Sequence, residues 1–253
     1  MKASRAFIVS LSLLLVLPWT ALACDVENGY GKAFLPDGSI YEGEFAACLF
    51  EGKGKLTWQN GSTFEGHFHK GLREGKGRET STGGWTYTGE YRAGQPNGQG
   101  EMVYADGDVY KGTFVAGQFS GQGKYTGASG ENYVGEFKNG EYHGRGLLTL
   151  EDGSQIAGEF RDGQCNGRGL AVYANGDRYQ GTFKNGDWDG IGMAIYASGD
   201  TYTGQFHAGQ FNGTGRYTSA DSGEVLDGEW KDGEFIDLKE QSAPGKGQPL
   251  VQM

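Results

Sequence analysis

Residues 41–63 read YEGEFAACLFEGKGKLTWQNGST, and this 23-residue pattern returns through most of the chain. Each unit opens with a large apolar residue, carries a glycine two positions later and an aromatic residue two positions after that. The residues that open the units are Tyr41, Phe64, Tyr87, Tyr110, Tyr133, Ile156, Tyr179 and Tyr202. A fixed period of this length indicates stacked repeats, each packed on its neighbours, and argues against a single closed core.

The complete unit reads Tyr-x-Gly-x-Phe, a six-residue stretch, Gly-x-Gly-x-Leu-x-Tyr, and then Asn-Gly or Asp-Gly. This pattern resembles the MORN repeat. Full units cover residues 41–225, and half-units lie at 29–40 and 226–236. The unit at 64–86 departs most, because Glu79 and Ser81 occupy positions that are usually apolar. The resemblance implies a non-enzymatic array that associates with other proteins and, in some family members, with lipid.

The alternation of side chains within a unit predicts its secondary structure. Residues 41–45 and 52–58 alternate apolar or glycine positions with polar ones, which is typical of strands with one aromatic and one polar face. Pairs such as Asn60-Gly61 separate successive strands and favour tight hairpin turns. We therefore expect an all-β fold, an elongated single-layer antiparallel sheet of stacked 23-residue β-hairpins. Aromatic rings should lie over glycines of neighbouring strands.

The two ends of the chain differ from the repeats. Lys2 and Arg5 precede a short apolar run, as in a signal peptide, and the run is too short to span a membrane. We expect residues 1–23 to be a signal peptide and residues 24–236 the repeat array. Residues 237–253, rich in Ser, Pro, Gly, Gln and Lys, should form a flexible tail. The protein should thus be exported to the bacterial periplasm or cell envelope, or be secreted.

Three cysteines leave alternatives at the start of the array. Cys165 lies five repeats beyond Cys48, about 50 Å by strand spacing, which is too far for a disulfide. Cys24 lies one repeat before Cys48, so those two residues are candidates for a bridge. Cys24 also follows Ala21-Leu22-Ala23, which resembles a relaxed lipobox and suggests lipid attachment. The bridge and the lipid exclude each other because both use the Cys24 sulfur; unmodified thiols are the third alternative.

Charge and motif content exclude several classes of function. Without Lys2 and Arg5, 20 basic residues remain against 32 acidic ones, a net charge of −12, which disfavours nucleic acid and anionic lipid as partners. We find no catalytic constellation and no cofactor motif. His67 and His69 share the polar face but lack a third ligand nearby, which argues against a metal site. We expect the many glutamates to pair across strands with lysines and arginines.

The tenth position of each unit is one candidate functional feature. It is expected in the six-residue connection at one long edge of the sheet. Its side chains either fold against their own hairpins or form an aromatic edge that grips a partner. The aromatic residues at this position are Phe50, Phe119, Tyr142, Trp188 and Phe211.

The second candidate is an apolar stretch on the polar face of the fifth to seventh units. There apolar side chains replace charged ones such as Lys55 and Arg78. The residues are Val134, Leu147, Leu170, Val172, Ile191, Met193 and Ile195. An exposed apolar row of this kind is normally covered, by the C-terminal tail, a protein partner or a second copy of the chain, and we favour the partner.

The resemblance to the MORN repeat, together with the expected signal peptide, implies a non-enzymatic protein-binding scaffold of the bacterial envelope, and we expect no cofactor. The alternative is a membrane-surface or lipid-associated module anchored through Cys24. Fold type does not decide between these functions.

Overall fold

The computed structural model describes residues 26–236, which divide into two compact units between Gln164 and Cys165. Every element of secondary structure in the described part is a β-strand. No helix of that part has the length and apolar character needed to span a membrane. The expected signal peptide at 1–23 and tail at 237–253 lie outside the described residues.

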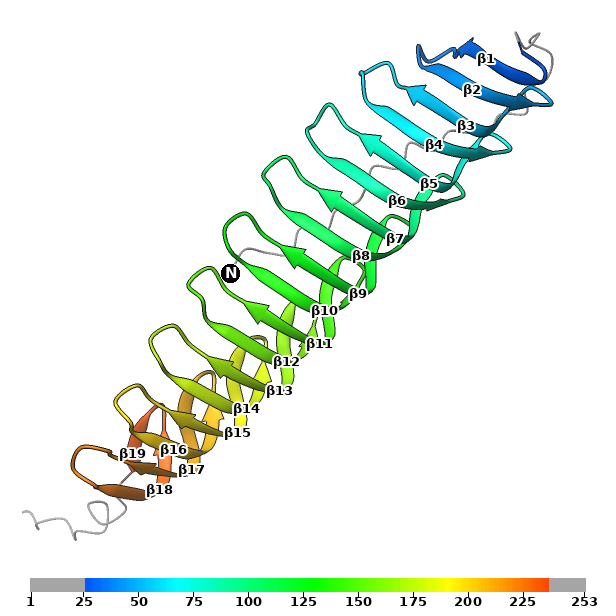
Figure 1. Ribbon diagram of the computed structural model, residues 1–253. Coiled ribbons are helices and arrows are strands. Elements are labelled where there is room, and N and C mark those ends of the chain that lie inside the picture. Colours follow the sequence, from blue (N-terminus) through cyan, green and yellow to red (C-terminus); the bar gives the residue numbers. More distant parts are fainter. Residues whose placement is uncertain (1–25, 237–253) are drawn as a thin grey trace, which may run out of the picture. The chain divides into compact units, whose positions relative to one another are not determined.

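In the first unit the strands pair antiparallel with their neighbours in chain order (Figure 1). Short strands of seven residues alternate with long strands of nine after the six-residue β1. The strands are β1 (Gly29–Phe34), β2 (Ile40–Ala46), β3 (Leu49–Thr57), β4 (Thr63–His69), β5 (Leu72–Thr80), β6 (Thr86–Arg92), β7 (Gln95–Val103), β8 (Val109–Val115), β9 (Gln118–Thr126), β10 (Asn132–Lys138), β11 (Glu141–Thr149) and β12 (Gln155–Arg161).

The second unit repeats the same hairpin, again with antiparallel pairing in chain order. Its strands are β13 (Gln164–Val172), β14 (Arg178–Lys184), β15 (Asp187–Ile195), β16 (Thr201–His207), β17 (Gln210–Thr218), β18 (Val225–Lys231) and β19 (Glu234–Ile236). The predicted all-β fold of 23-residue antiparallel hairpins is confirmed.

The connections differ from the expectation in one respect. The six residues after each Phe are not a loop, because β3 already begins at Leu49 and the turn before it is only Ala47-Cys48. Both turn residues have positive φ, 49° and 64°, as a two-residue type I′ turn requires. Asn139-Gly140 and Asn185-Gly186 form two-residue turns of the same kind. Pairs such as Asn60-Gly61 lie in the wider connections, where Trp58 N–H donates to Ser62 O at 2.9 Å. In that connection only Gly61 has positive φ.

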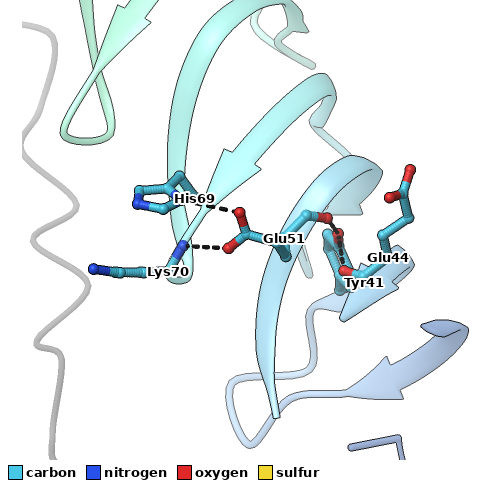
Figure 2. Close-up of polar contacts among 5 residues, drawn as sticks. All are labelled: Tyr41, Glu44, Glu51, His69 and Lys70. Atoms are coloured by element: carbon cyan, nitrogen blue, oxygen red, sulfur yellow. Dashed lines mark hydrogen bonds and ion pairs between the residues drawn. The ribbon is translucent and has the colours of Figure 1, made fainter. Parts of the chain in front are cut away.

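The aromatic face of the sheet is the core. The Tyr41 ring is buried and lies over Gly54 of the neighbouring strand, where an added Cβ would overlap it. Its hydroxyl donates to Glu44 O at 2.9 Å (Figure 2), and its ring meets Phe45 and Phe68 edge-on at 5.1 and 5.0 Å. The same buried position recurs at Phe64, Tyr87, Tyr110, Tyr133, Tyr179 and Tyr202. The predicted cover of glycines by aromatic rings is thus confirmed.

Candidate functional site

Cross-strand neighbours form a row along the middle of the polar face. We call this row the outer row. In the first unit Lys55 lies opposite Glu42 on one side and Glu65 on the other, and Glu65 also lies opposite Arg78. Charges of opposite sign therefore alternate, the arrangement that stabilises neighbouring strands of a sheet. The cross-strand pairing expected for the glutamates is present here in the strand register.

The outer row becomes apolar toward the end of the first unit. Val134 on β10 lies directly opposite Leu147 on β11, and Leu147 lies opposite Ala157 on β12. The side chains of Val134 and Leu147 are exposed, at 50% and 41% of their surface. Two of the sequence-predicted residues are therefore in contact across one strand pair.

In the second unit the outer row passes from Leu170 to Gln180, Met193, Thr203 and Arg216. Leu170 and Met193 are exposed at 45% and 42%. The flanking residues are Val172 and Ile191, which are exposed, and Ile195, which is half-buried. The structure thus gathers five of the seven predicted apolar residues on β13–β15, and we call these five the apolar patch.

The aromatic residues at the tenth position do not lie at an edge loop, because the long strands already include them. Each ring stacks on the tyrosine that opens its own repeat and is half-buried. The stacked pairs are Tyr41–Phe50 at 3.8 Å, Tyr110–Phe119 at 3.7 Å, Tyr133–Tyr142 at 3.9 Å, Tyr179–Trp188 at 4.3 Å and Tyr202–Phe211 at 3.7 Å. This packing gives the rings a structural role, while gripping a partner stays a prediction.

Two of these rings are also fixed by polar contacts. The Tyr142 hydroxyl donates to Glu131 at 2.7 Å, and Trp188 Nε1 donates to the Tyr173 hydroxyl at 2.8 Å. Burial, followed by the hydrogen bond to Glu131 and its charge, raises the pKa of Tyr142. The rings are thereby held in one orientation on the aromatic face.

The second full repeat, residues 64–86, contains a polar cluster that the sequence pattern did not predict. Arg73 stands at the tenth position and binds Glu79 at 2.7 Å, with side-chain exposures of 19% and 15%. The Tyr91 hydroxyl donates to the same carboxylate at 2.9 Å. The guanidinium also lies over the rings of Trp58 and Phe64, at 5.5 and 5.6 Å from their centroids. The sequence did hold one signal: Arg73 and Glu79, which both depart from the repeat pattern, fall in the same repeat.

The histidines of the polar face have ordinary structural partners. His69 Nδ1 lies 2.9 Å from Glu51, and Lys70 N–H donates to the same carboxylate at 3.0 Å (Figure 2). These hydrogen bonds, the backbone one first, lower the pKa of Glu51. His67 Nδ1 lies 3.3 Å from Lys76 O. Within residues 26–236 no group of three or more His, Cys, Asp and Glu residues is arranged to hold a metal ion.

The cysteines are in two states. Cys48 is disulfide-bonded. Cys165 is a buried thiol, exposed at only 2%. Cys24, for which a bridge to Cys48 and lipid attachment are the alternatives, lies outside the described residues.

Comparison with known proteins adds one strong match. The family model described as "MORN repeat" matches eight consecutive segments, residues 41–63, 64–86, 87–109, 110–131, 133–155, 157–178, 179–201 and 202–224. No curated protein matches the chain.

Solved structures show only distant similarity. The TCP10 domain of Danio rerio CPAP is 15% identical, with a TM-score of 0.40, over 79% of this chain and 100% of that one. The Drosophila melanogaster SAS-4 TCP domain, solved with a proline-rich motif of Ana2, is 12% identical, with a TM-score of 0.37, over 73% and 96%. Staphylococcus aureus virginiamycin B lyase is 14% identical, with a TM-score of 0.16, over 82% and 72%. These similarities are too weak to support an inference about function.

Proposed function

The chain belongs to the MORN-repeat family, and we propose that it is a non-enzymatic scaffold of the bacterial envelope that binds a protein partner through the apolar patch. A repeat array presents a long regular surface on which single positions vary without loss of the fold. Binding specificity therefore resides in the side chains that depart from the repeat pattern on an exposed face.

The observation that carries this proposal is the exposure of the patch. Leu170, Val172, Ile191 and Met193 all lie on the solvent-facing side of β13 and β15, and Ile191 is 72% exposed. At the positions equivalent to Leu170 and Met193, earlier repeats carry Lys55 and Arg78. Covering apolar surface is favourable by about 25 cal/mol per Å². The fold does not need these side chains, because the core is on the other face.

The double variant Leu170→Asp with Met193→Asp tests the proposal. Tagged wild-type and variant proteins are incubated with envelope extract, and the captured proteins are identified by mass spectrometry. We expect the variant to lose its partner while its melting temperature stays within a few degrees of wild type, because both side chains are outside the core.

A matched control adds the same charge elsewhere on the outer face. Thr88→Asp with Gln122→Asp places two carboxylates on exposed positions of β6 and β9, and it should retain the partner. The proposal fails if the patch variant captures the same proteins as wild type, or if it melts far lower and its loss of binding follows from unfolding. A dimer lost in the patch variant alone would identify a second copy as the partner.

Export to the envelope is supported by the disulfide at Cys48, because disulfides persist in oxidising compartments outside the cytoplasm. The same observation favours a bridge to Cys24 over lipid attachment at Cys24. Peptide mass analysis of the mature protein, with alkylation before and after reduction, tests both points. Cys24 should be the first residue and, like Cys48, should react only after reduction. A diacylglyceryl group on Cys24 would favour the membrane-anchored alternative, and a retained Lys2 and Arg5 would contradict export.

A further inference from the structure

The outer face of β13–β17 has an unusual charge pattern. The chain contains 32 acidic residues, yet none stands at the central outer-face positions of these strands. Those positions hold Arg168, Leu170 and Val172 on β13, Arg178, Gln180 and Thr182 on β14, Ile191, Met193 and Ile195 on β15, Thr201, Thr203 and Gln205 on β16, and Thr214, Arg216 and Thr218 on β17. At these positions the charged residues beside the apolar patch are Arg168, Arg178 and Arg216.

The cross-strand partners of Arg168 on β14 and of Arg178 on β13 and β15 are uncharged, unlike the partners of Lys55 in the first unit. Arg178 lies opposite Val172 on one side and Ile195 on the other, within the apolar patch itself. Arg168 lies opposite Thr182. Both arginines are exposed, and neither forms an ion pair with another residue of the described part of the chain. By contrast, Lys55 lies between two glutamates.

The nearest acidic side chains lie outside this surface or are already engaged. Asp227 on β18 lies opposite Arg216, at the far border of the surface. Glu229 on β18 accepts a hydrogen bond from the Thr214 hydroxyl at 2.9 Å. On β15, Asp187 and Asp189 come at the start of the strand, next to the turn, and Asp187 lies opposite Lys184. Asp189 accepts a contact from His207 Nδ1 at 3.0 Å. Arg168 and Arg178 are thus exposed beside apolar side chains, with no carboxylate opposite Arg168 on β14 or opposite Arg178 on β13 and β15.

Resting on the proposed function, we propose that the apolar patch binds an acidic, apolar protein segment. Its apolar side chains cover Leu170, Ile191 and Met193, and its carboxylates meet Arg168 and Arg178. Guanidinium groups bind carboxylates through two parallel hydrogen bonds, and such pairs strengthen when apolar neighbours exclude water. An anionic membrane is the less suitable partner, because the remainder of the chain carries the excess of negative charge and repels a negative surface.

Defined peptides test this chemistry directly. Three fluorescent peptides of equal length are used, one of alternating Leu and Glu, one of alternating Leu and Lys, and one of alternating Ser and Glu. Fluorescence anisotropy at low ionic strength gives their affinities. We expect the Leu–Glu peptide to bind wild type at least about tenfold more tightly than either other peptide, and this preference should weaken as salt is added.

Two charge-matched variants locate the effect. Arg168→Gln with Arg178→Gln and Arg216→Gln should lose most of the preference for the Leu–Glu peptide. The control is the triple variant Lys53→Gln, Lys76→Gln and Arg145→Gln. It removes the same charge from the first unit and should keep the preference for the Leu–Glu peptide. Circular dichroism on both variants checks that the fold is retained.

Three results overturn the inference: equal binding of the Leu–Glu and Leu–Lys peptides, no binding of the Leu–Glu peptide, or equal loss in both variants. Binding to phosphatidylglycerol vesicles that disappears in the Arg168, Arg178 and Arg216 variant, without peptide binding, would assign the surface to a membrane instead. The proposed function is judged separately, by the partners that the Leu170 and Met193 variant captures. Capture that depends on the patch, together with absent peptide selectivity, would keep that function and reject the acidic partner.

Discussion

Arg73 shows how a single residue can break the repeat pattern without breaking the fold. The tenth position usually carries a ring stacked on a tyrosine, and here a guanidinium takes the place of that ring. Its charge is balanced by Glu79 at 2.7 Å, and it donates a further hydrogen bond to Gly94 O at 2.5 Å. The Tyr91 hydroxyl donates a hydrogen bond to the same carboxylate. The two departures, Arg73 and Glu79, therefore compensate one another on the aromatic face.

We predict that removing one partner costs much more stability than replacing both. Glu79→Ala leaves Arg73 without its carboxylate on a largely buried surface, and for buried pairs such a loss costs about 3–5 kcal/mol. Some solvent exposure at both side chains places the expected value at the lower end of that range. Arg73→Phe with Glu79→Leu restores the usual pattern and should be at least as stable as wild type.

Urea denaturation of wild type, both single variants and the double variant measures the coupling between the two sites. Additive effects in this cycle would contradict the compensation. The Lys111–Glu101 pair is the control, since its lysine is 75% exposed and its atoms lie 3.5 Å apart. Glu101→Ala should change stability by less than about 1 kcal/mol, as expected for a surface pair.

At the residue scale, the sequence predicted the contacts that follow from the repeat pattern. The ring of Tyr41 over Gly54 follows from the periodic glycines and aromatics, because a ring needs a position without a side chain. The Arg73–Glu79–Tyr91 cluster was missed because Arg73 and Glu79 both depart from the repeat pattern, and because the Tyr91 hydroxyl comes from the next repeat. The apolar patch was found, because alternation places Leu170 and Met193 on the face opposite the core.

The hairpin is the element on which the array is built, and its turns were only partly predicted. Asn-Gly and Asp-Gly pairs suggested the tight turns. Asn139-Gly140 does form such a turn, whereas Asn60-Gly61 lies in a wider connection, and Ala47-Cys48 forms a tight turn without either pair. Ala and Cys rarely adopt positive φ, so composition gave no signal at that turn. Because the turn is shorter than expected, Phe50 lies in β3 rather than in an edge loop, and its ring stacks on Tyr41.

Packing between neighbouring hairpins sets the stability of each element. Phe137 on β10 is 4% exposed and meets Tyr133 of its own strand at 5.1 Å and Tyr110 of β8 at 4.9 Å, both edge-on. It therefore joins two successive repeats. We predict that Phe137→Ala lowers the free energy of unfolding by about 3 kcal/mol, the lower end of the usual cost, because the core is one sheet thick.

Chemical denaturation followed by circular dichroism measures the effect of Phe137→Ala. Val134→Ala, three residues away on the same strand but on the outer face, is the control and should cost less than about 1 kcal/mol. Equal losses in the two variants would mean that the aromatic face is not the core.

Over the whole molecule, one face of the strands stabilises the fold, and the opposite face is the one that we propose for binding. The aromatic face of each unit holds the buried rings, and the outer face holds the charges and the apolar patch. Substitutions on the outer face can therefore change the partner while the stacking of repeats is kept. Because the chain as a whole is acidic, the proposed place for a negatively charged protein segment is the centre of the β13–β17 surface, where the charged residues are arginines.

The buried tyrosines also link the fold to alkaline pH. Burial raises the pKa of Tyr179 and of Tyr196 to about 12, and it raises the pKa of Tyr87 and Tyr110 as well. The ordinary value is 10.0. Because the folded protein holds these protons more tightly than the unfolded chain, the resulting stability is complete below pH 10 and is lost as pH rises from 10 toward 12. Both units carry such rings, so both should unfold in this window.

We predict that tyrosinate absorbance and loss of β-sheet circular dichroism rise together in an alkaline titration, because a buried ring must reach water before it ionises. Tyr30 is 72% exposed, so it can ionise without unfolding, although desolvation and the neighbouring Glu42 raise its pKa. Tyr30→Phe should therefore remove a part of the absorbance change that is independent of unfolding and leave the unfolding midpoint in place. If most tyrosines ionised while the sheet signal stayed constant, the rings would be accessible in the folded state. The aromatic face would then be open to solvent, and the assignment of binding to the opposite face would have to be reversed.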